Sequence, residues 1–426
     1  MPPISARAFD SPRLRGFNPF TMKNASLPVL SFVLVGLLSS HAADWPRFRG
    51  PDQNGISKES GISAGLLEGG GKVLWKASIG IGFCSISVAN GRAYTMGNQK
   101  AAGGNEKDED TVWCLDAITG KEIWKHSYAE DLKSNLYEGG PNATPTVDGN
   151  QVFTLSKTGR AFCLDAAKGT VIWEKNLAKD LGAKKPEWGF SSSVLVEGDV
   201  AIYNVGTAGT ALNRKTGEVV WKSGAGVAGY SAAVLFNQGK ERLAIMMTAR
   251  DATALNPADG KIVWSHPWET QHEVNAADAV VSGNRFFLSS GYNHGSSVIE
   301  VKDNKPSVVW ENKNIRNHFA SSVLLKGHLY GLDEKELRCV DFATGEVKWS
   351  DKVSGKGTLL MADGKIVALT EKGELIIAAA SPEAFKPLGR AQILGGKCWT
   401  MPALANGKLY ARNAKGDLVC VEVGGK

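Results

Sequence analysis

One phrase of ten residues recurs along the chain and restricts its fold more than any other feature. Complete copies read LDAITGKEIW (115–124), LDAAKGTVIW (164–173), LNRKTGEVVW (212–221), LNPADGKIVW (255–264) and VDFATGEVKW (340–349). A degenerate copy ends at Trp310, and GKVLWKAS at 71–78 matches only the end of the phrase. The tryptophans follow one another at intervals of roughly 40–50 residues, the period of several repeat architectures.

Each repeat contains patterns of short β-strands. Between residues 143 and 176 the runs ATPTVDG, NQVFTLS, RAFCLDA and TVIWEKN are bounded by Gly, Asn or Asp. Asp-Gly and Asn-Gly pairs, such as Asp148-Gly149, suit two-residue hairpins that need positive φ. Strand repeats of this period are typical of propellers and β-solenoids. The sequence therefore predicts an all-β fold built from four-stranded units.

The number of units follows from the first strand of each. First strands fall near residues 85, 144, 192, 231, 278, 321, 359 and 402. The last unit (397–423) has three strands, and the strand at 71–78 lacks the three that would precede it. Pairing that strand with LVCVEV (418–423) closes a ring and leaves only short, protected sheet edges. We expect a single eight-bladed β-propeller over 71–423, preceded by a lead-in segment at 43–70.

The recurring phrase belongs to the frame of the ring, because nearly every unit has it. Its tryptophan, near the end of the outer strand, can cover the face of the neighbouring blade. Its short polar residue, such as Asp116 or Asn213, precedes the turn and can accept backbone N–H bonds there. The phrase therefore predicts structural contacts rather than chemistry.

The pattern A-x-D-x-x-T-G-x-x-x-W resembles the tryptophan-docking motif of the PQQ-type eight-bladed propellers. That superfamily contains the quinoprotein alcohol dehydrogenases and the BamB-like outer-membrane-assembly propellers. The resemblance covers nearly all of 71–423, and DWPRFRGPDQNGIS (44–57) resembles the lead-in of secreted bacterial PQQ-like repeat proteins. It implies an architecture, while function depends on the individual site.

The N-terminal residues have the pattern of a secretory signal. The apolar run LPVLSFVLVGLL (27–38) follows Lys23 and precedes the small residues of SSHAAD. We expect cleavage near Ala42, with Met22 as an alternative start, and a permanently anchored N-terminal helix as the alternative. No cysteine precedes Cys84, so the pattern offers no lipidation site. A periplasmic or secreted location is expected, without a membrane span after cleavage.

Residues outside the repeat register gather in loops that enter the first strands or join the second and third strands. These loops lie around the central funnel of a propeller, on one face, and loops on a rigid scaffold often carry binding residues. The candidate funnel and ligand-binding residues are Trp188, Trp268, Glu269, His272, Glu273, Asn275, Asp278, Asn293, His294, Arg316, His318 and Trp399. The alternative is that they bind only one another and buried water.

The resemblance also implies a test for an enzyme. Quinoprotein dehydrogenases hold planar PQQ between a tryptophan and a disulfide of adjacent cysteines, with Ca²⁺ on Glu and Asn and an Asp as base. Here Trp399 could form the floor, and Glu273, Asn275 and Asp278 are the candidate calcium ligands. The chain has no Cys-Cys dipeptide and no C-x-x-C-H haem motif, and it lacks a Walker loop and an H-E-x-x-H motif. We assign no catalytic residue and keep PQQ with Ca²⁺ as the alternative cofactor pair.

Two of the six cysteines depart from the repeat. Cys114, Cys163, Cys339 and Cys420 occupy one strand position, which indicates small buried apolar sites. Cys84 and Cys398 begin the first strands of the first and eighth blades, which ring closure makes neighbours. A disulfide bond between them is a candidate in a secreted protein.

The charge gives no indication of a nucleic-acid partner. The 426 residues carry a formal net charge of +6, and part of this lies in the signal segment. We expect a monomeric, non-catalytic binding scaffold for an envelope or secreted protein or an extracellular polymer. The alternative is a quinoprotein-like dehydrogenase with its cofactor in the funnel.

Overall fold

The computed structural model describes residues 16, 43–101, 107–134, 136–353 and 355–424. The predicted signal run at 27–38 lies outside these residues. From Ala42 onward the chain forms one unit, which is described below.

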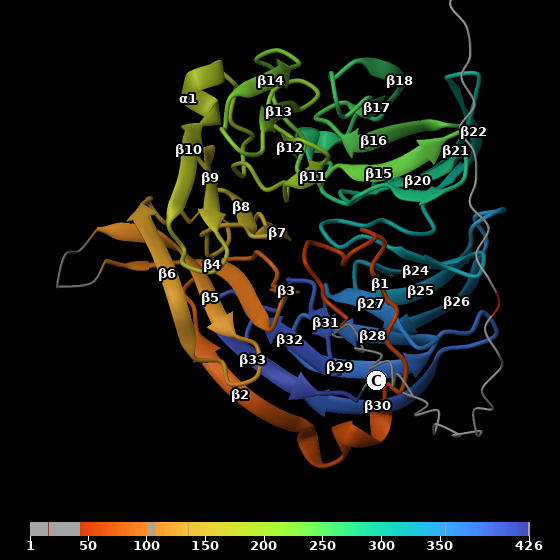
Figure 1. Ribbon diagram of the computed structural model, residues 1–426. Coiled ribbons are helices and arrows are strands. Elements are labelled where there is room, and N and C mark those ends of the chain that lie inside the picture. The colour runs from red at the N-terminus through yellow and green to blue at the C-terminus, as the bar shows by residue number, and fades with distance from the viewer. Residues whose placement is uncertain (1–15, 17–42, 102–106, 135, 354, 425–426) are drawn as a thin grey trace, which may run out of the picture. The chain divides into compact units, whose positions relative to one another are not determined.

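Eight blades confirm the predicted fold class, and each is built on four antiparallel strands (Figure 1). The strands of blades 1 to 4 are β3 (Ser87–Ala89), β4 (Arg92–Lys100), β5 (Asp108–Asp116), β6 (Glu122–Ala129); β7 (Thr146–Asp148), β8 (Gln151–Leu155), β9 (Arg160–Asp165), β10 (Val171–Asn176); β11 (Leu195–Glu197), β12 (Val200–Tyr203), β13 (Thr210–Asn213), β14 (Val219–Lys222); and β15 (Val234–Gln238), β16 (Glu241–Met247), β17 (Asp251–Leu255), β18 (Ile262–Pro267). Those of blades 5 to 8 are β19 (Val280–Ser282), β20 (Arg285–Ser290), β21 (Gly295–Lys302), β22 (Lys305–Asn312); β23 (Val323–Leu325), β24 (His328–Asp333), β25 (Glu336–Asp341), β26 (Val347–Lys352); β27 (Thr358–Ala362), β28 (Lys365–Leu369), β29 (Glu374–Ala379), β30 (Lys386–Gln392); and β31 (Ala403–Ala405), β32 (Lys408–Arg412), β33 (Asp417–Glu422), β2 (Lys72–Ser78).

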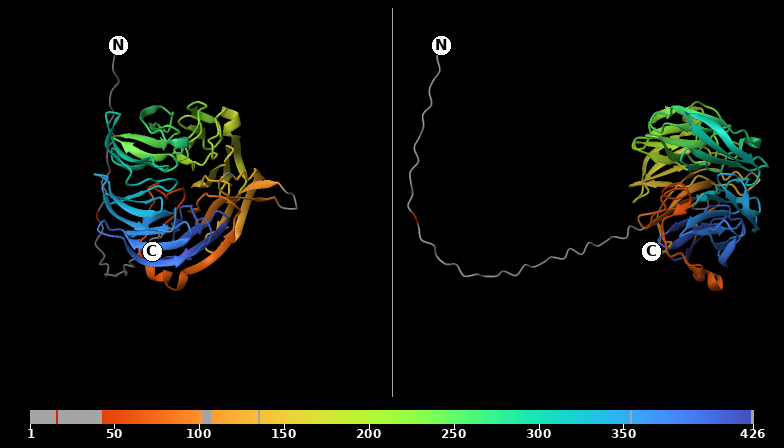
Figure 2. Two further views of the ribbon diagram at one scale, coloured as in Figure 1. Left: turned by 180° about the vertical axis from the view of Figure 1, so that it is seen from behind. Right: turned by 90° about the vertical axis from the view of Figure 1, so that its right-hand side faces the viewer.

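The first strand of each blade is the innermost. Neighbouring first strands contact one another, as β3 does with β7 and β31. Blade 1 differs in length, because β4 and β5 have nine residues each and their hairpin extends beyond the other blades (Figures 1 and 2). Short helical turns are few: η1 (Ala64–Gly70), α1 (Leu177–Leu181) and η2 (Gln271–Glu273).

The N-terminal strand closes the ring, as predicted. β2 is the outer strand of blade 8 and pairs antiparallel with β33, from Lys72 opposite Glu422 to Ser78 opposite Asp417. The last blade is therefore assembled from the two ends of the repeat region. A bulge between Val73 and Trp75 repeats the irregularity found beside the tryptophan of other outer strands, such as Trp173.

The recurring tryptophans join each blade to the next. Trp75 on blade 8 donates its indole N–H to Ala117 O of blade 1 at 3.2 Å, and Trp124 donates to Ala166 O of blade 2 at 3.0 Å. The same bond continues from Trp173, Trp221, Trp310 and Trp349 to the blades that follow them. Trp264 instead bonds Gln238, since the turn of blade 5 is degenerate. The predicted role of the repeated phrase is confirmed.

Where the turn contains a glycine, that glycine fits against the indole of the preceding blade. Gly120 has φ 72°, and a β-carbon built on it would lie 2.5 Å from Trp75. Asp116 Oδ1 shapes this turn by accepting the N–H groups of Ile118 and Thr119. The turn needs glycine for two reasons, its left-handed backbone and the ring that lies against it.

The lead-in segment (residues 43–70) crosses the centre of the ring, where Figure 1 shows it in red and orange. Its backbone or side chains contact inner strands or their approaches in six blades, through Trp45 to Val88, Pro46 to Val147, Gln53 to Ala233, Arg49 to Ser322, Gly55 to Met361 and Glu59 to Asn406. β1 (Ile56–Ser57) adds to blade 7 in parallel with β27. The lead-in therefore holds the blades from inside.

The lead-in also replaces the missing tryptophan between blades 7 and 8. Strand β30 carries no tryptophan, and η1 packs against it, with Leu67 buried in the adjoining core. The carboxylate of Asp363 accepts the N–H groups of Gly61 and Ile62, which fixes this stretch on blade 7.

We predict that Gly120→Ala destabilises the propeller more than Gly149→Ala does. Both glycines have positive φ, but a β-carbon at Gly149 would meet nothing within 4 Å. The backbone conformation alone costs about 1–2 kcal/mol, and displacing Trp75 adds about 1–3 kcal/mol. Urea denaturation of both variants measures the difference, and equal losses would contradict the role of the ring contact.

A second prediction concerns the ion pair of the lead-in. Arg49 Nε lies 3.9 Å from Asp278 Oδ2, and both side chains are buried. Because Arg49→Met leaves a buried carboxylate without its cation, we expect a loss of about 3–5 kcal/mol in the free energy of unfolding. Adding Asp278→Asn should recover part of it.

The matched control is Lys58→Met in the same segment. Lys58 pairs with Asp52 at the surface, so its loss should cost no more than about 1 kcal/mol. A similar loss for the Arg49 and Lys58 variants would show that the buried pair adds nothing.

Candidate functional site

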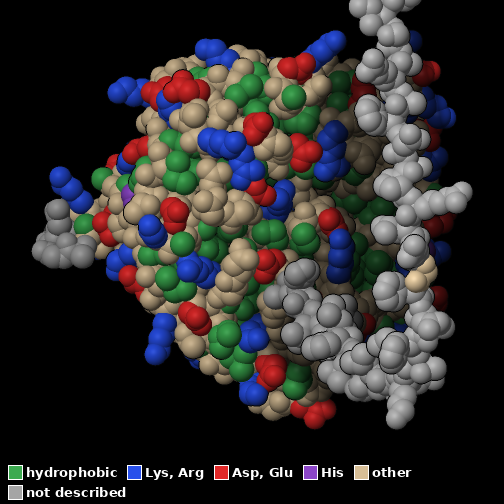
Figure 3. Space-filling model, in the orientation of Figure 1, with side chains coloured by type: hydrophobic (Ala, Val, Ile, Leu, Met, Phe, Trp, Pro, Cys, Tyr) green, Lys and Arg blue, Asp and Glu red, His purple; other side chains and the backbone are tan. Residues whose placement is uncertain are grey.

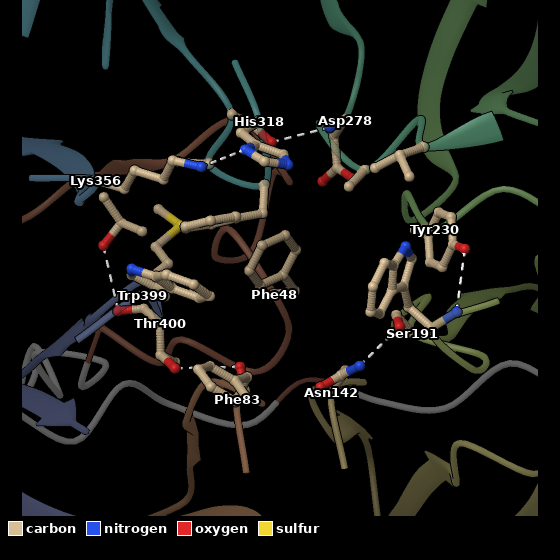
Figure 4. A pocket seen from close by; sticks show the side chains of 18 of the residues that line it. Phe48, Phe83, Asn142, Ser191, Tyr230, Asp278, His318, Lys356, Trp399 and Thr400 are labelled. Atoms are coloured by element: carbon tan, nitrogen blue, oxygen red, sulfur yellow. Dashed lines mark hydrogen bonds between the residues drawn. The ribbon is translucent and has the colours of Figure 1, made fainter. Parts of the chain in front are cut away.

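A cavity of about 330 Å³ lies at the funnel, where loops from the blades converge (Figure 4). Its walls come from residues just before the first strands, such as Phe83 before β3, Asn142 before β7 and Trp399 before β31. This volume is near the lower end of small-molecule sites, which span about 300–1,000 Å³. The expectation that the off-register loops share one face is met by these walls.

Aromatic rings form a continuous series around the mouth, here called the aromatic arc. Neighbouring ring centroids are 4.6–5.9 Å apart along the series Trp188, Tyr137, Phe83, Trp399, Phe319, His318 and Tyr292. The rings come from six blades, and each lies tilted or edge-on to the next, the geometry that aromatic pairs prefer.

Lysines and tyrosine hydroxyls fix the arc from outside. Lys397 Nζ lies 4.5 Å from the Trp399 ring centroid and pairs with Glu138 at 2.9 Å. Two rings further along the arc, Lys157 Nζ donates to Tyr137 Oη at 2.9 Å. These contacts hold the rings in place, so the mouth is largely preformed.

The lead-in closes the floor of the cavity. Phe48 lines it (Figure 4), and the buried Arg49 lies behind it against Asp278. Asp278 Oδ1 accepts the N–H of Ala232 at 2.8 Å. Burial raises the pKa of Asp278 to about 6, although the Arg49 guanidinium opposes this shift. The cavity thus has a carboxyl group at its base.

His318 and Lys356 form a polar pair on the wall. Lys356 Nζ lies 2.7 Å from His318 Nδ1. Burial, and then the Lys356 ammonium, lower the pKa of His318 to about 4. The imidazole is therefore neutral near pH 7, Nδ1 accepts from the ammonium, and Nε2 carries the proton.

Asn142 contributes an acceptor without a partner. Its amide nitrogen donates to Ser191 Oγ at 3.0 Å, while its buried Oδ1 has no hydrogen-bond partner. An unpaired buried acceptor costs free energy unless a ligand or water supplies a donor. The lining therefore offers both donors and acceptors among its aromatic rings.

Four of the residues predicted from sequence line the cavity together: Trp188, Asp278, His318 and Trp399. Trp399 belongs to the wall, where its indole donates to Glu371 Oε1 at 2.9 Å. The sequence suggested Trp399 as the floor of the cavity, but Phe48 occupies that position.

The other predicted residues lie outside the lining. Trp268 is buried, donates to Ser290 Oγ and packs edge-on against His294. Arg316 forms two hydrogen bonds to Asp333 and reaches Asn293. Glu269 and His272 are exposed.

The predicted calcium set does not converge on the cavity. Glu273 accepts from Arg250 at 3.0 Å. The Asn275 amide donates to Thr248 O, and its Oδ1 accepts from Ser290 and a second hydroxyl. Only Asp278 reaches the cavity, and Arg49 offsets its charge. Among the described residues, no group of three or more His, Cys, Asp or Glu side chains is arranged to hold a metal ion.

The residues present therefore do not fit the quinone and calcium that the resemblance implied. No cysteine lines the cavity, and Lys356 is the one cationic side chain of its lining, too little for an anionic quinone. Cys84 and Cys398 are both buried free thiols, which corrects the predicted disulfide bond. Cys84 Sγ contacts Met96 O at 3.0 Å, whereas Cys398 Sγ lies near the Gly395 carbonyl.

Sequence reasoning missed Phe48, Phe83, Tyr230, Tyr292 and Lys356. Phe83 and Tyr230 lie four residues before the first strands β3 and β15, as Trp399 does before β31, so that register could have identified them. Nothing in the sequence of the lead-in indicated that Phe48 enters the funnel, because this depends on the path of the segment through the ring.

Comparisons with known proteins agree with this architecture. Residues 108–351 match the family described as outer membrane protein assembly factor BamB. No curated protein matches the sequence. The solved structure of BamB from Moraxella catarrhalis is similar, with TM-score 0.59 and 14% identity over 82% of this chain and 97% of that chain.

Two enzymes have the same fold. The quinohemoprotein alcohol dehydrogenase from Comamonas testosteroni has TM-score 0.64 and 14% identity, over 90% of this chain and 81% of that one. A europium-containing methanol dehydrogenase has TM-score 0.66 and 13% identity, over 90% of both chains. These identities show a common fold alone.

We predict that Lys356→Met raises the pKa of His318. The Lys356 ammonium is one of the two causes that lower the pKa of His318, so its removal should raise this pKa. Burial, the other cause, remains and keeps the pKa below the ordinary 6.5. NMR titration of the imidazole protons measures the change. Lys397→Met is the control, since Lys397 pairs with Glu138 instead; an unchanged pKa in the Lys356 variant would refute the coupling.

Proposed function

This chain belongs to the BamB family of outer-membrane-assembly propellers. From that premise we propose that it is a non-catalytic binding scaffold for a protein or polymer partner. The observation that supports this most is the aromatic arc around an open, preformed mouth. Aromatic rings held by their neighbours supply large contact area with little loss of side-chain freedom, which is why they dominate binding energies.

The chemistry of the mouth supports binding over catalysis. Apart from its tyrosines, the titratable groups of the lining are His318, Lys356 and Asp278, and each already has an ionic or hydrogen-bonding partner. A quinone dehydrogenase would need a cation-rich cradle and calcium ligands, which the lining residues do not supply. The proposed partner is an envelope or secreted molecule, and the proposed location is the periplasm or the cell exterior.

The face of the molecule shown in Figure 3 is not dominated by charge of one sign. On the face shown in Figure 3, Lys and Arg are interspersed with Asp and Glu. No helix among the described residues is long and apolar enough to cross a membrane. The contact with a partner is therefore proposed to depend on the shape and rings of the mouth.

Photo-crosslinking tests the proposal. A photoreactive residue replaces Leu136, which lines the mouth and is 91% exposed, or Leu388 on β30, which is 52% exposed. We expect specific crosslinked adducts in cells when the photoreactive residue is at position 136. These adducts should disappear when Trp399→Ala is added, and the residue at position 388 should not form them. Identical adducts from both positions, or none from 136, would contradict a binding mouth.

Reconstitution separates the scaffold from the quinone enzyme. We expect no quinone absorbance band and no dye reduction with alcohols when the full chain is incubated with PQQ and Ca²⁺. The Comamonas testosteroni enzyme serves as the positive control. A stoichiometric band that disappears in Asp278→Asn would overturn the non-catalytic assignment.

A further inference from the structure

The aromatic and polar side chains that line the funnel indicate the chemical class of the ligand. Trp188 and Trp399 line the cavity from different blades, and the rings of Tyr137 and Phe83 join them in a continuous series. A ring face carries negative charge density. It therefore attracts C–H groups that are polarised by neighbouring oxygens, such as those on the face of a sugar ring.

Polar groups of both kinds interrupt the aromatic wall. His318 donates through Nε2, which Figure 4 shows turned away from Lys356, and Lys356 adds its ammonium. Asn142 Oδ1 is an unpartnered acceptor, and Asp278 offers carboxylate oxygens at the base. A hydroxyl both donates and accepts, so a polyol can satisfy all four groups.

An apolar side chain from a peptide would satisfy the rings alone. It would also leave Asn142 Oδ1 without a donor and desolvate the Lys356 ammonium without replacing its hydrogen bonds to water, which costs about 1–3 kcal/mol for a neutral group and more for a charged one. The mixture of rings, donors and acceptors therefore favours a hydroxylated ligand.

The charges of the lining are balanced locally. Arg49 lies 3.9 Å from Asp278, and Glu334 lies 3.8 Å from Lys356. Neither charged residue faces the cavity without an opposite charge nearby. A neutral ligand matches this arrangement better than an anionic or cationic one.

The floor restricts how a chain can enter. Phe48 lines the bottom, and the lead-in behind it fills the centre of the ring. A cavity of about 330 Å³ that is closed at one end accepts a chain terminus rather than a chain passing through.

We propose that the funnel binds the terminal rings of a neutral oligosaccharide, with Trp188 and Trp399 as stacking platforms and Asn142, Asp278, His318 and Lys356 as hydroxyl-binding groups. This rests on the proposed function of the mouth and names the chemistry of its partner.

Titration of the full chain tests the proposal. The neutral probes are maltose, maltotetraose, cellobiose, cellotetraose and N,N′-diacetylchitobiose, followed by calorimetry and tryptophan fluorescence. Digalacturonate is the anionic probe, and a Trp-containing tripeptide amide is the apolar one. We expect saturable binding of at least one neutral probe, with the tetramer no more than modestly tighter than the dimer.

Variants assign the binding to the funnel. Trp399→Ala and Asn142→Ala should each weaken binding about tenfold, as expected for loss of a stacked ring or a hydrogen bond. Trp399→Phe, which keeps a ring, should retain most of the affinity. Leu388→Ala, on the outer strand, should leave it unchanged, and circular dichroism checks that each variant is folded.

Three results would overturn the oligosaccharide assignment: no neutral probe binds, binding is insensitive to Trp399→Ala, or digalacturonate or the tripeptide binds at Trp399 and the neutral probes do not. The photo-crosslinks from position 136 separate this failure from that of the proposed function. If they persist while the sugars fail, the mouth binds another class of partner; if they are also absent, both proposals fail.

Discussion

The contact between an indole and a glycine turn determines the architecture of this protein. Except at Trp264 and Trp349, the tryptophan of an outer strand lies against a glycine turn of the following blade and donates to its backbone, as Trp124 does to Ala166 O. The turn must be glycine because the ring occupies the space of a β-carbon. Where the phrase degenerates, other groups take over: Gln238 receives the Trp264 bond, and η1 covers the outer strand of blade 7. The ring therefore tolerates local loss of the motif while its neighbours retain it.

The rigid frame makes the funnel mouth a well-defined site. Seven aromatic rings from loops of different blades meet at distances of 4.6–5.9 Å, and the frame limits how far each can move. The lead-in adds the floor through Phe48 and joins it to the wall through Arg49 and Asp278. The same buried ion pair therefore ties the lead-in to the ring and places a carboxyl group in the lining of the cavity.

The fold could be predicted almost completely from sequence because its determinants are local and repeated. The strand pattern, the turns and the docking tryptophans predicted eight blades, and the unmatched strand at 71–78 predicted its pairing with the last one. The site was predicted only in part. Trp188, Asp278, His318 and Trp399 fall at loop positions next to first strands, whereas Trp268 and Asn275 satisfy buried contacts in the same loops. Whether a loop residue lines the cavity or is buried in the loop depends on the direction of its side chain, which the sequence pattern does not give. The position of Phe48 depends on contacts between the lead-in and residues far away in the sequence.

Ring closure also determines when the propeller can finish folding. β2 pairs with β33, and Glu59 bonds the backbone of Asn406 and Gly407, so the earliest ordered segments find their partners at the far end of the chain. During synthesis these segments cannot complete their pairing until nearly all residues have emerged. Such contacts have high sequence separation, which slows folding because loop entropy is lost before the contacts form. Blades 1 to 7 can form from consecutive strands, but blade 8 cannot, and final assembly is therefore a late event that follows complete delivery of the chain.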